Sequence, residues 1–499
     1  MALNANNQLT HHGLQFRAAA RRAVFLALCW ATGNPAAMTS TKPPVETSLP
    51  SKPTLNQDDR ILVFAPHPDD ETLGCAGVIQ QAVAMKLPVR IVWLTYGDNN
   101  EWSFMLYRKR FVLMPEAVRK MGEVRHSEAV AAATILGVDP DQLAFLGYPD
   151  FGTLTIWYRH WAGQPPLESM LTKVTKVPYA NAFRPGAPYK GEDILHDLET
   201  NIREFKPTKV FVSHPSDHNV DHQALYLFTR VALWDLEREM CPEIYPYLVH
   251  FAHWPVPQGL QMARNILPPA PLASVVDWEI MPLSTEQVKG KESALHAHRS
   301  QLDSSRTYLN SFVRANELFG DFPPVVASVI QTNNQLLTGH RQKFPLLKEE
   351  LNDEERTNFV GIENMSVARD NDDLVVNVRL SKHLFGGVSA SVFAFGYRDD
   401  QPFEQMPKLR INIGELRHEV LDQERKLPKT AVQIRRRGRE LALRIPMKAL
   451  GDPRRVLACV HTYYLDVDPL DWAEWRVVEI APSEQTVASP VDESIQKVE

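Results

Sequence analysis

The sequence predicts an α/β domain followed by a separate all-β domain. Short apolar runs alternate with helical patterns up to about residue 325, and alternating β-type runs dominate from about residue 365. The length of 499 residues also exceeds the usual size of a single hydrophobic core. The composition, with 44% hydrophobic and 23% charged residues, is that of an ordinary globular protein.

Four apolar runs and three helical patterns justify the first domain, which we place at residues 58–325. The expected strands are Arg60–Ala65, Pro88–Gly97, Leu143–Asp150 and Thr208–Pro215. The expected helices are Leu73–Met85, Ala117–Val138 and Glu192–Phe205. Strands separated by helices in this order predict a Rossmann-like, mostly parallel sheet with helices on both faces.

The C-terminal part of the chain is expected to form a β-sandwich over residues 365–485. A hairpin is expected around Arg435–Glu440, because apolar and polar residues alternate on both sides of this polar stretch. Helical patterns are expected over about 284–350, and residues 326–364 are expected to connect the two domains. Residues 486–499 are expected to be a disordered tail.

The N-terminal 37 residues have the parts of a secretory signal. Three arginines precede the short apolar run Ala23–Ala31, and small residues follow it. We therefore expect export to the periplasm or the cell exterior, whereas a disordered or misassigned extension would leave the protein in the cytoplasm. The apolar run is too short for a stable transmembrane span. Residues 38–57, which are rich in Pro, Ser and Thr, are expected to be a linker.

Charge and cysteine content narrow the possible functions. The net charge of -6 provides no broad basic field, so nucleic-acid binding is not expected. The four cysteines lie far apart and form no CxxC pair, which argues against a disulfide framework and against a thiolate zinc site. Any metal would therefore be held by histidine and carboxylate. No pattern in the sequence indicates an oligomeric state.

A polar cluster follows the first expected strand. The stretch APHPDDETLGCAG, Ala65–Gly77, places His67, Asp69, Asp70 and Glu71 where that strand ends. Ligands of open α/β sheets bind at the carboxyl ends of strands, and the dipole of a helix beginning here would favour ionised acids. A histidine and a carboxylate three residues apart can both reach one cation. A second carboxylate beside them can face a water molecule instead.

A second polar cluster follows the fourth expected strand. It contains His214, Asp217, His218, Asp221 and His222. Two strand ends of one parallel sheet can converge, and two imidazoles with one carboxylate suit catalytic zinc. Alone, the first cluster could be a turn with a helix cap and the second a polar surface loop. Their occurrence together favours a metal site.

Five stretches carry a resemblance to a known family. They are PHPDDETLGCAG, DHQAL, RHSEAVAAATILGV, FLGYPD and KESALHAHRSQ. On these stretches, residues 58–325 resemble the PIG-L/LmbE-like family of zinc-dependent N-acetylglucosamine deacetylases. The first stretch is highly specific for this family, and the resemblance does not extend to the C-terminal β-domain.

The resemblance implies a hydrolase that removes the N-acetyl group from a GlcNAc-containing glycan or glycolipid. His67, Asp70 and His222 match the family's ligands for one zinc ion per chain. Asp69 matches the general base that takes a proton from the attacking water. The supporting groups are expected to be Glu71 and Asp221.

The proton donor is where the sequence departs from the family. The family often has a histidine three residues before the last ligand, and Asn219 stands there, with a histidine one residue earlier at His218. Asn219 could donate a hydrogen bond to the oxyanion. Arg125 matches an arginine of the substrate pocket, although a surface pair with Glu128 is the alternative. His298 either approaches the pocket or is an ordinary helix histidine.

Two other interpretations remain open at this stage. The protein could be a metal-containing sugar-binding protein without turnover, or an amidase that acts on a different acyl–amine conjugate. The β-domain could then hold a sugar, and four aromatic residues are candidates for stacking on it, although such residues are more often part of the core. These candidates are Tyr463, Tyr464, Trp472 and Trp475.

Overall fold

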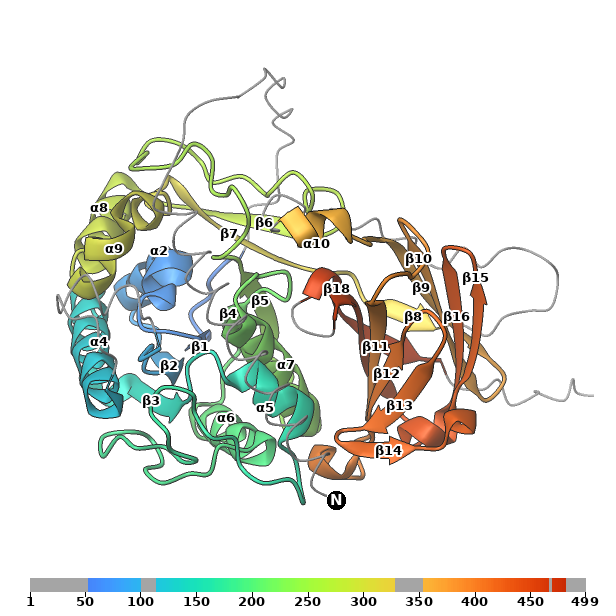
Figure 1. The fold of residues 1–499 in the computed structure, drawn as a ribbon. Helices are drawn as coiled ribbons and strands as arrows, with labels where there is room; N and C mark the ends of the chain where they lie inside the picture. Colours follow the sequence, from blue (N-terminus) through green and yellow to red (C-terminus); the bar gives the residue numbers. More distant parts are fainter. Residues whose placement is uncertain (1–52, 100–113, 328–352, 466–468, 482–499) are drawn as a thin grey trace, which may run out of the picture.

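The computed structural model describes residues 53–99, 114–327, 353–465 and 469–481 (Figure 1). The predicted signal segment, most of the predicted linker and the predicted C-terminal tail lie outside these ranges. Within them, no helix combines the length and apolar character needed to cross a bilayer. The three cysteines that they include, Cys75, Cys241 and Cys459, are free, as expected.

The first domain is built on a seven-stranded sheet with the order β3-β2-β1-β4-β5-β7-β6. The strands are β1 (Ile61–Ala65), β2 (Val89–Thr95), β3 (Leu143–Tyr148), β4 (Lys209–Ser213), β5 (Glu243–Tyr247), β6 (Asp277–Pro282) and β7 (Asn316–Asp321). The first five in this order pair in parallel, whereas β7 runs antiparallel to both β5 and β6. The mostly parallel sheet is therefore confirmed, and β1 to β4 are the four predicted strands.

Helices cover both faces of this sheet, as predicted (Figure 1). They are α2 (Asp70–Ala84), α4 (Pro115–Ile135), α5 (Thr153–Arg159), α6 (Gly191–Phe205), α7 (Val220–Asp235), α8 (Thr285–Leu295) and α9 (Arg299–Asn310). Helix α8 packs on α2 and α4, while α5 and α6 pack on α7. All five residues of β1 are buried between the two helical layers, which explains why the strand is a continuous apolar run.

The helical prediction for residues 284–350 is confirmed up to Asn310 and is wrong for residues 316–327, whereas residues 328–350 lie outside the described ranges. Helices α8 and α9 are followed by the strands β7 and β8 (Val325–Ala327). Strand β8 pairs in parallel with the C-terminal strand β18 (Pro469–Ile480), so the chain joins the second domain's sheet at this point. The sequence of β7, NELFGD, has too few apolar residues to register as a strand pattern.

The second domain is the expected sandwich of two largely antiparallel sheets. One sheet has the order β15-β16-β10-β9, and the other has the order β14-β13-β12-β11-β17-β18-β8. The remaining elements are α10 (Asp353–Thr357), β9 (Ile362–Asp370), β10 (Asp373–Leu380), β11 (Val388–Tyr397), β12 (Lys408–Ile413), β13 (His418–Asp422), β14 (Arg425–Leu427), β15 (Gln433–Arg437), β16 (Glu440–Pro446) and β17 (Arg455–Tyr464). Strands β15 and β16 form the predicted hairpin, with Arg437 paired to Glu440.

An aromatic interface joins the two domains. The indole of Trp157 on α5 lies 5.6 Å from the ring of Phe395 on β11 and 5.4 Å from the ring of Phe403. It also meets Trp475 of β18 edge-on, with the ring centroids 6.1 Å apart. Trp475 is 2% exposed, so this candidate for sugar stacking is part of the core. Aromatic packing of this extent makes a fixed rather than a loose domain contact.

We predict that Trp475→Ala lowers the free energy of unfolding by about 3–5 kcal/mol, because it leaves a large cavity between the domains. Urea unfolding followed by circular dichroism measures this change. The matched control is Leu416→Ala, since that side chain is 88% exposed and its loss should change stability by less than about 0.5 kcal/mol. A Trp475→Ala protein as stable as the wild type would contradict the interface assignment.

Candidate metal centre

The two polar clusters meet at the point where the strand order of the sheet reverses. Strand β1 lies between β2 and β4 and pairs in parallel with both. The chain leaves β1 towards α2 and leaves β4 towards α7, and these connections lie side by side at the carboxyl edge. Such a switch point is the usual ligand site of an open α/β sheet.

Three ligand atoms converge at this edge. His67 Nδ1 and His222 Nε2 each lie 3.1 Å from Asp70 Oδ2. The two nitrogens lie 3.3 Å from each other. Two ligands bound tetrahedrally at about 2.0 Å from one cation would be about 3.3 Å apart. The three side chains therefore fit a single small cation, and they are the three residues that the family resemblance implies as ligands.

Carboxylates behind the cluster fix both imidazole rings. His67 Nε2 lies 3.1 Å from Asp150 Oδ1 and 3.2 Å from Asp221 Oδ2. His222 Nδ1 lies 3.0 Å from Asp217 Oδ2. In each ring, one nitrogen thus faces a carboxylate, and the other faces the point where His67, Asp70 and His222 converge. This arrangement is typical of histidines that bind metals.

The charge balance of the cluster favours a positive occupant. Burial lowers the pKa of His67, but the Asp150 carboxylate outweighs this effect and raises the pKa well above its usual value. Burial also lowers the pKa of His222, and the carboxylates of Asp217 and Asp70 raise it to about 9. Both rings are therefore surrounded by negative charge that attracts either protons or a metal ion.

Asp69 lies beside the cluster in an unusual backbone conformation. Its φ of 140° lies in a region that non-glycine residues rarely adopt. Its backbone N–H donates to Glu71 Oε2 at 3.0 Å, and its carboxylate accepts from Arg125 Nη2 at 3.3 Å. Burial raises the pKa of Asp69 to about 7, although the Arg125 guanidinium opposes this rise. A carboxylate held in this way can accept a proton near neutral pH.

Glu71 and His298 support Asp69 from inside the protein. His298 Nε2 lies 3.1 Å from Glu71 Oε1, and Trp93 Nε1 donates to Glu71 Oε2 at 2.9 Å. His298 is 0% exposed, so the structure places it behind the site rather than in a substrate pocket. His298 lies in the junction between α8 and α9 and not within a helix, so the predicted alternative of an ordinary helix histidine is wrong as well.

Arg125 of α4 is buried and spans several segments of the site. It donates to Gly97 O at 2.9 Å and to Pro68 O at 2.8 Å, in addition to its contact with Asp69. The alternative pair with Glu128 does not occur, because that carboxylate accepts from the backbone and hydroxyl of Ser300. Arg125 is therefore positioned to orient Asp69.

Asn219 and His218 occupy the loop between β4 and α7. Asn219 caps the helix, since its Oδ1 accepts from Asp221 N at 2.9 Å. The ring of His218 lies 4.8 Å from that of Phe251, and burial lowers its pKa to about 4. Both residues are half-buried.

Two residues near the cluster were not predicted from the sequence. Asp150 follows β3, so the rule that polar residues gather at strand ends could have found it. His250 follows β5, and its ring lies 4.8 Å from that of His222. Strand β5, EIYPY, contains a proline and a glutamate and was not recognised, which left His250 without a structural context.

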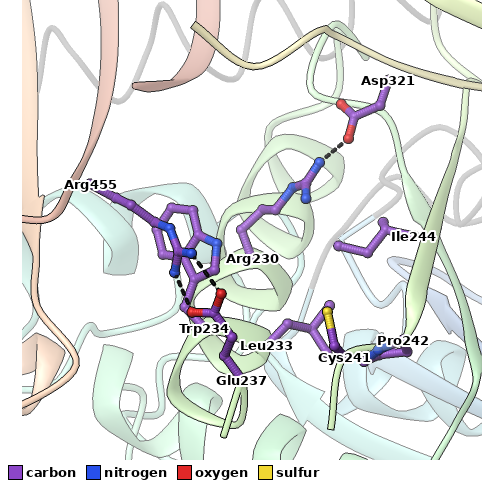
Figure 2. Close-up of a pocket in the computed structure, with 9 residues that line it drawn as sticks. All are labelled: Arg230, Leu233, Trp234, Glu237, Cys241, Pro242, Ile244, Asp321 and Arg455. Atoms are coloured by element: carbon purple, nitrogen blue, oxygen red, sulfur yellow. Dashed lines mark hydrogen bonds and ion pairs between the residues drawn. The ribbon is translucent and has the colours of Figure 1, made fainter. Parts of the chain in front are cut away.

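A cavity of about 290 Å³ lies far from this centre, between α7, β5 and the second domain (Figure 2). It adjoins Trp234, which is twelve residues along α7 from His222, or about 18 Å at 1.5 Å per residue. Its charged groups are paired, with Arg230 bonded to Asp321 and Arg455 bonded to Glu237. The cavity is therefore a gap in the domain interface and not part of the metal centre.

Comparison with known proteins agrees with this geometry. Residues 62–233 match the family described as PIG-L, GlcNAc-PI de-N-acetylase. A 1D-myo-inositol 2-acetamido-2-deoxy-alpha-D-glucopyranoside deacetylase of Mycobacterium sp. (strain KMS) is 37% identical over 90 residues, covering 18% of this chain and 28% of that protein. A glucosamine-6-phosphate deaminase-like protein of Bacteroides thetaiotaomicron is 22% identical over 292 residues, covering 49% of this chain and 36% of that protein. The chain thus spans about a third of the length of these curated relatives.

Two solved structures align with about half of this chain. An N,N'-diacetylchitobiose deacetylase from Pyrococcus horikoshii aligns with a TM-score of 0.33 and 19% identity, covering 52% of this chain and 82% of that chain. A conserved protein from Thermus thermophilus aligns with a TM-score of 0.31 and 22% identity, covering 51% of this chain and 84% of that chain.

The first domain is thus an α/β domain with a histidine–carboxylate centre at the switch point of its sheet. The match over residues 62–233 and the similarity to the mycobacterial deacetylase agree with the resemblance of this domain to the PIG-L/LmbE-like deacetylase family.

We predict that Asp70→Ala and His222→Ala each abolish tight metal binding, because each removes one of three converging ligands. Elemental analysis after dialysis should find about one metal ion per wild-type chain and far less in the variants. His196→Ala is the control, since that histidine is exposed on α6. A variant of the cluster that retained the wild-type metal content would contradict the assignment.

We also predict that Gly97→Ala destabilises the protein by about 1–3 kcal/mol. A Cβ at this position would lie 2.2 Å from Arg125 Nη1, and Gly97 has a φ of +62°. Gly163→Ala is the matched control, because no atom lies within 4 Å of its added Cβ. Thermal unfolding of both variants gives the comparison, and equal stability would show that Arg125 is not tightly held.

Proposed function

We propose that the protein is a zinc-dependent hydrolase that removes the N-acetyl group from a GlcNAc-containing glycan or glycolipid. The observation that carries this proposal is the convergence of His67, Asp70 and His222 at the switch point, with the Asp69 carboxylate beside them. The family match over residues 62–233 supports it. The mycobacterial deacetylase among the relatives points to an N-acetylated sugar as the substrate.

Zinc is the metal that suits this set of ligands. Two neutral imidazoles and one carboxylate leave positions open for water and substrate, as in catalytic zinc sites. His67, Asp70 and His222 would hold one ion per chain. When bound there, zinc would polarise the amide carbonyl and lower the pKa of water.

Asp69 would act as the general base in this reaction. It takes a proton from the attacking water while the water oxygen forms a bond to the carbonyl carbon. Arg125 holds the carboxylate from one side, and the bond from the Asp69 backbone to Glu71 holds the main chain from the other. Because these contacts preorganise the carboxylate, little rearrangement is needed during the reaction.

The second half of the reaction breaks the C–N bond and releases acetate and a free amine. Asp69 can return its proton to the leaving nitrogen, so that the proton balance closes without another acid. The Oδ1 of Asn219 is already occupied at the N-terminus of α7, which leaves its amide N–H groups to donate to the oxyanion. His218, in the same loop, is the other candidate to assist the leaving amine.

We predict that Asp69→Asn retains the metal but lowers kcat by at least about 100-fold, because a neutral amide cannot take up the proton. Acetate release from GlcNAc, chitooligosaccharides and a GlcNAc glycolipid measures the activity, with and without a chelator. Unchanged turnover in this variant would refute the base assignment. Saccharide binding by the metal-loaded wild type without acetate release would instead indicate a binding protein, and hydrolysis of other acyl–amine conjugates alone would indicate a different amidase.

A further inference from the structure

Trp472 of the second domain lies against the loop that leads to the metal centre. Its ring is 5.3 Å from the ring of His218, and the two planes are nearly perpendicular, at 85°. The side chain is half-buried, so part of the indole is accessible. The other three aromatic candidates lie elsewhere: Trp475 is in the domain interface, Tyr463 contacts His461, and Tyr464 donates to Glu354.

A chain of neighbouring groups connects Trp472 to the metal ligands. The rings of His67 and His222 lie 5.2 Å apart, and those of His222 and His250 lie 4.8 Å apart. The backbone N–H of His218 then donates to His250 O at 2.8 Å. His218 therefore lies near the three converging residues, and Trp472 lies beyond it, where the second domain meets the first.

The backbone around Trp472 is firmly held. The preceding residue, Asp471, is fully buried and accepts from Ile362 N at 2.7 Å. Three residues later, Trp475 is fixed in the aromatic interface. A binding group on such a rigid strand loses little conformational entropy when it contacts a ligand.

We propose that Trp472 and His218 form a subsite for a second sugar ring of the substrate. With the acetamido group of one ring at the metal centre, the rest of the saccharide extends over the half-buried indole. The apolar face of a pyranose packs on an aromatic ring, and the neighbouring imidazole bonds to a ring hydroxyl. This inference rests on the proposed deacetylase function, and it makes an N-acetylated saccharide of two or more rings the preferred substrate over free GlcNAc.

The test compares the specificity constant, kcat/KM, for GlcNAc, N,N'-diacetylchitobiose and the corresponding trisaccharide. Trp472→Ala should lower kcat/KM for the two longer substrates by about tenfold, mainly through KM, with a much smaller loss for GlcNAc. Trp472→Phe retains an aromatic face and should keep most of the preference. Tyr464→Ala is the control, since this half-buried tyrosine of the same domain contacts Glu354 instead. An equal loss for all three substrates, or no loss, would overturn the subsite.

Binding to the Asp69→Asn protein separates this inference from the proposed function. Calorimetry should show tighter binding of the disaccharide than of GlcNAc, and Trp472→Ala in the same background should remove the difference. If the wild type releases no acetate from any saccharide, the deacetylase proposal fails, and the same titration still decides the subsite. Disaccharide binding that is unaffected by Trp472→Ala, or absent altogether, would overturn it.

Discussion

The rest of the structure depends on the burial of several carboxylates and imidazoles at one edge of the sheet. Asp70, Asp217 and Asp221 are each at most 1% exposed, and an unpaired buried carboxylate is strongly unfavourable. Each one is therefore matched with an imidazole of the cluster, His67 or His222. This pairing requires the ends of β1 and β4 to be adjacent, which the parallel order of the sheet provides.

The same constraint explains the strained backbone at Asp69. For its carboxylate to lie beside the cluster while Asp70 begins α2, the chain must turn sharply, and it does so with a φ of 140°. A conformation of this kind costs about 1–3 kcal/mol and persists only when neighbouring contacts determine it. Glu71 provides such a contact to the Asp69 backbone, and Glu71 in turn is held by His298. Asp69, Asp70 and Glu71 of the motif thus act as one unit with His298.

Sequence alone predicted the elements whose signals are continuous in the chain. Strands β1 to β4 are buried apolar runs, and the ligands His67 and Asp70 stand in one contiguous motif. The strand and the site residues that the sequence did not predict depend on contacts between distant segments. Strand β5 mixes a glutamate and a proline with apolar residues and so lacks a clear strand pattern, and His250 was missed together with it. Likewise, the sequence does not show that His298, in the junction between α8 and α9, contacts Glu71 from more than two hundred residues earlier.

Helix α7 lies on the side of the first domain that faces the second domain (Figure 1). Its first turn carries Asp221 and His222, whereas the Asp235 carboxylate at its last turn accepts from the Tyr397 hydroxyl of β11 at 2.9 Å. Just beyond it, Arg455 of β17 forms two bonds of 2.8 Å to Glu237. A helix held at both ends cannot shift without moving His222, one of the three converging residues. The sandwich therefore contributes to the geometry of the centre through packing, even where its residues do not touch the ligands.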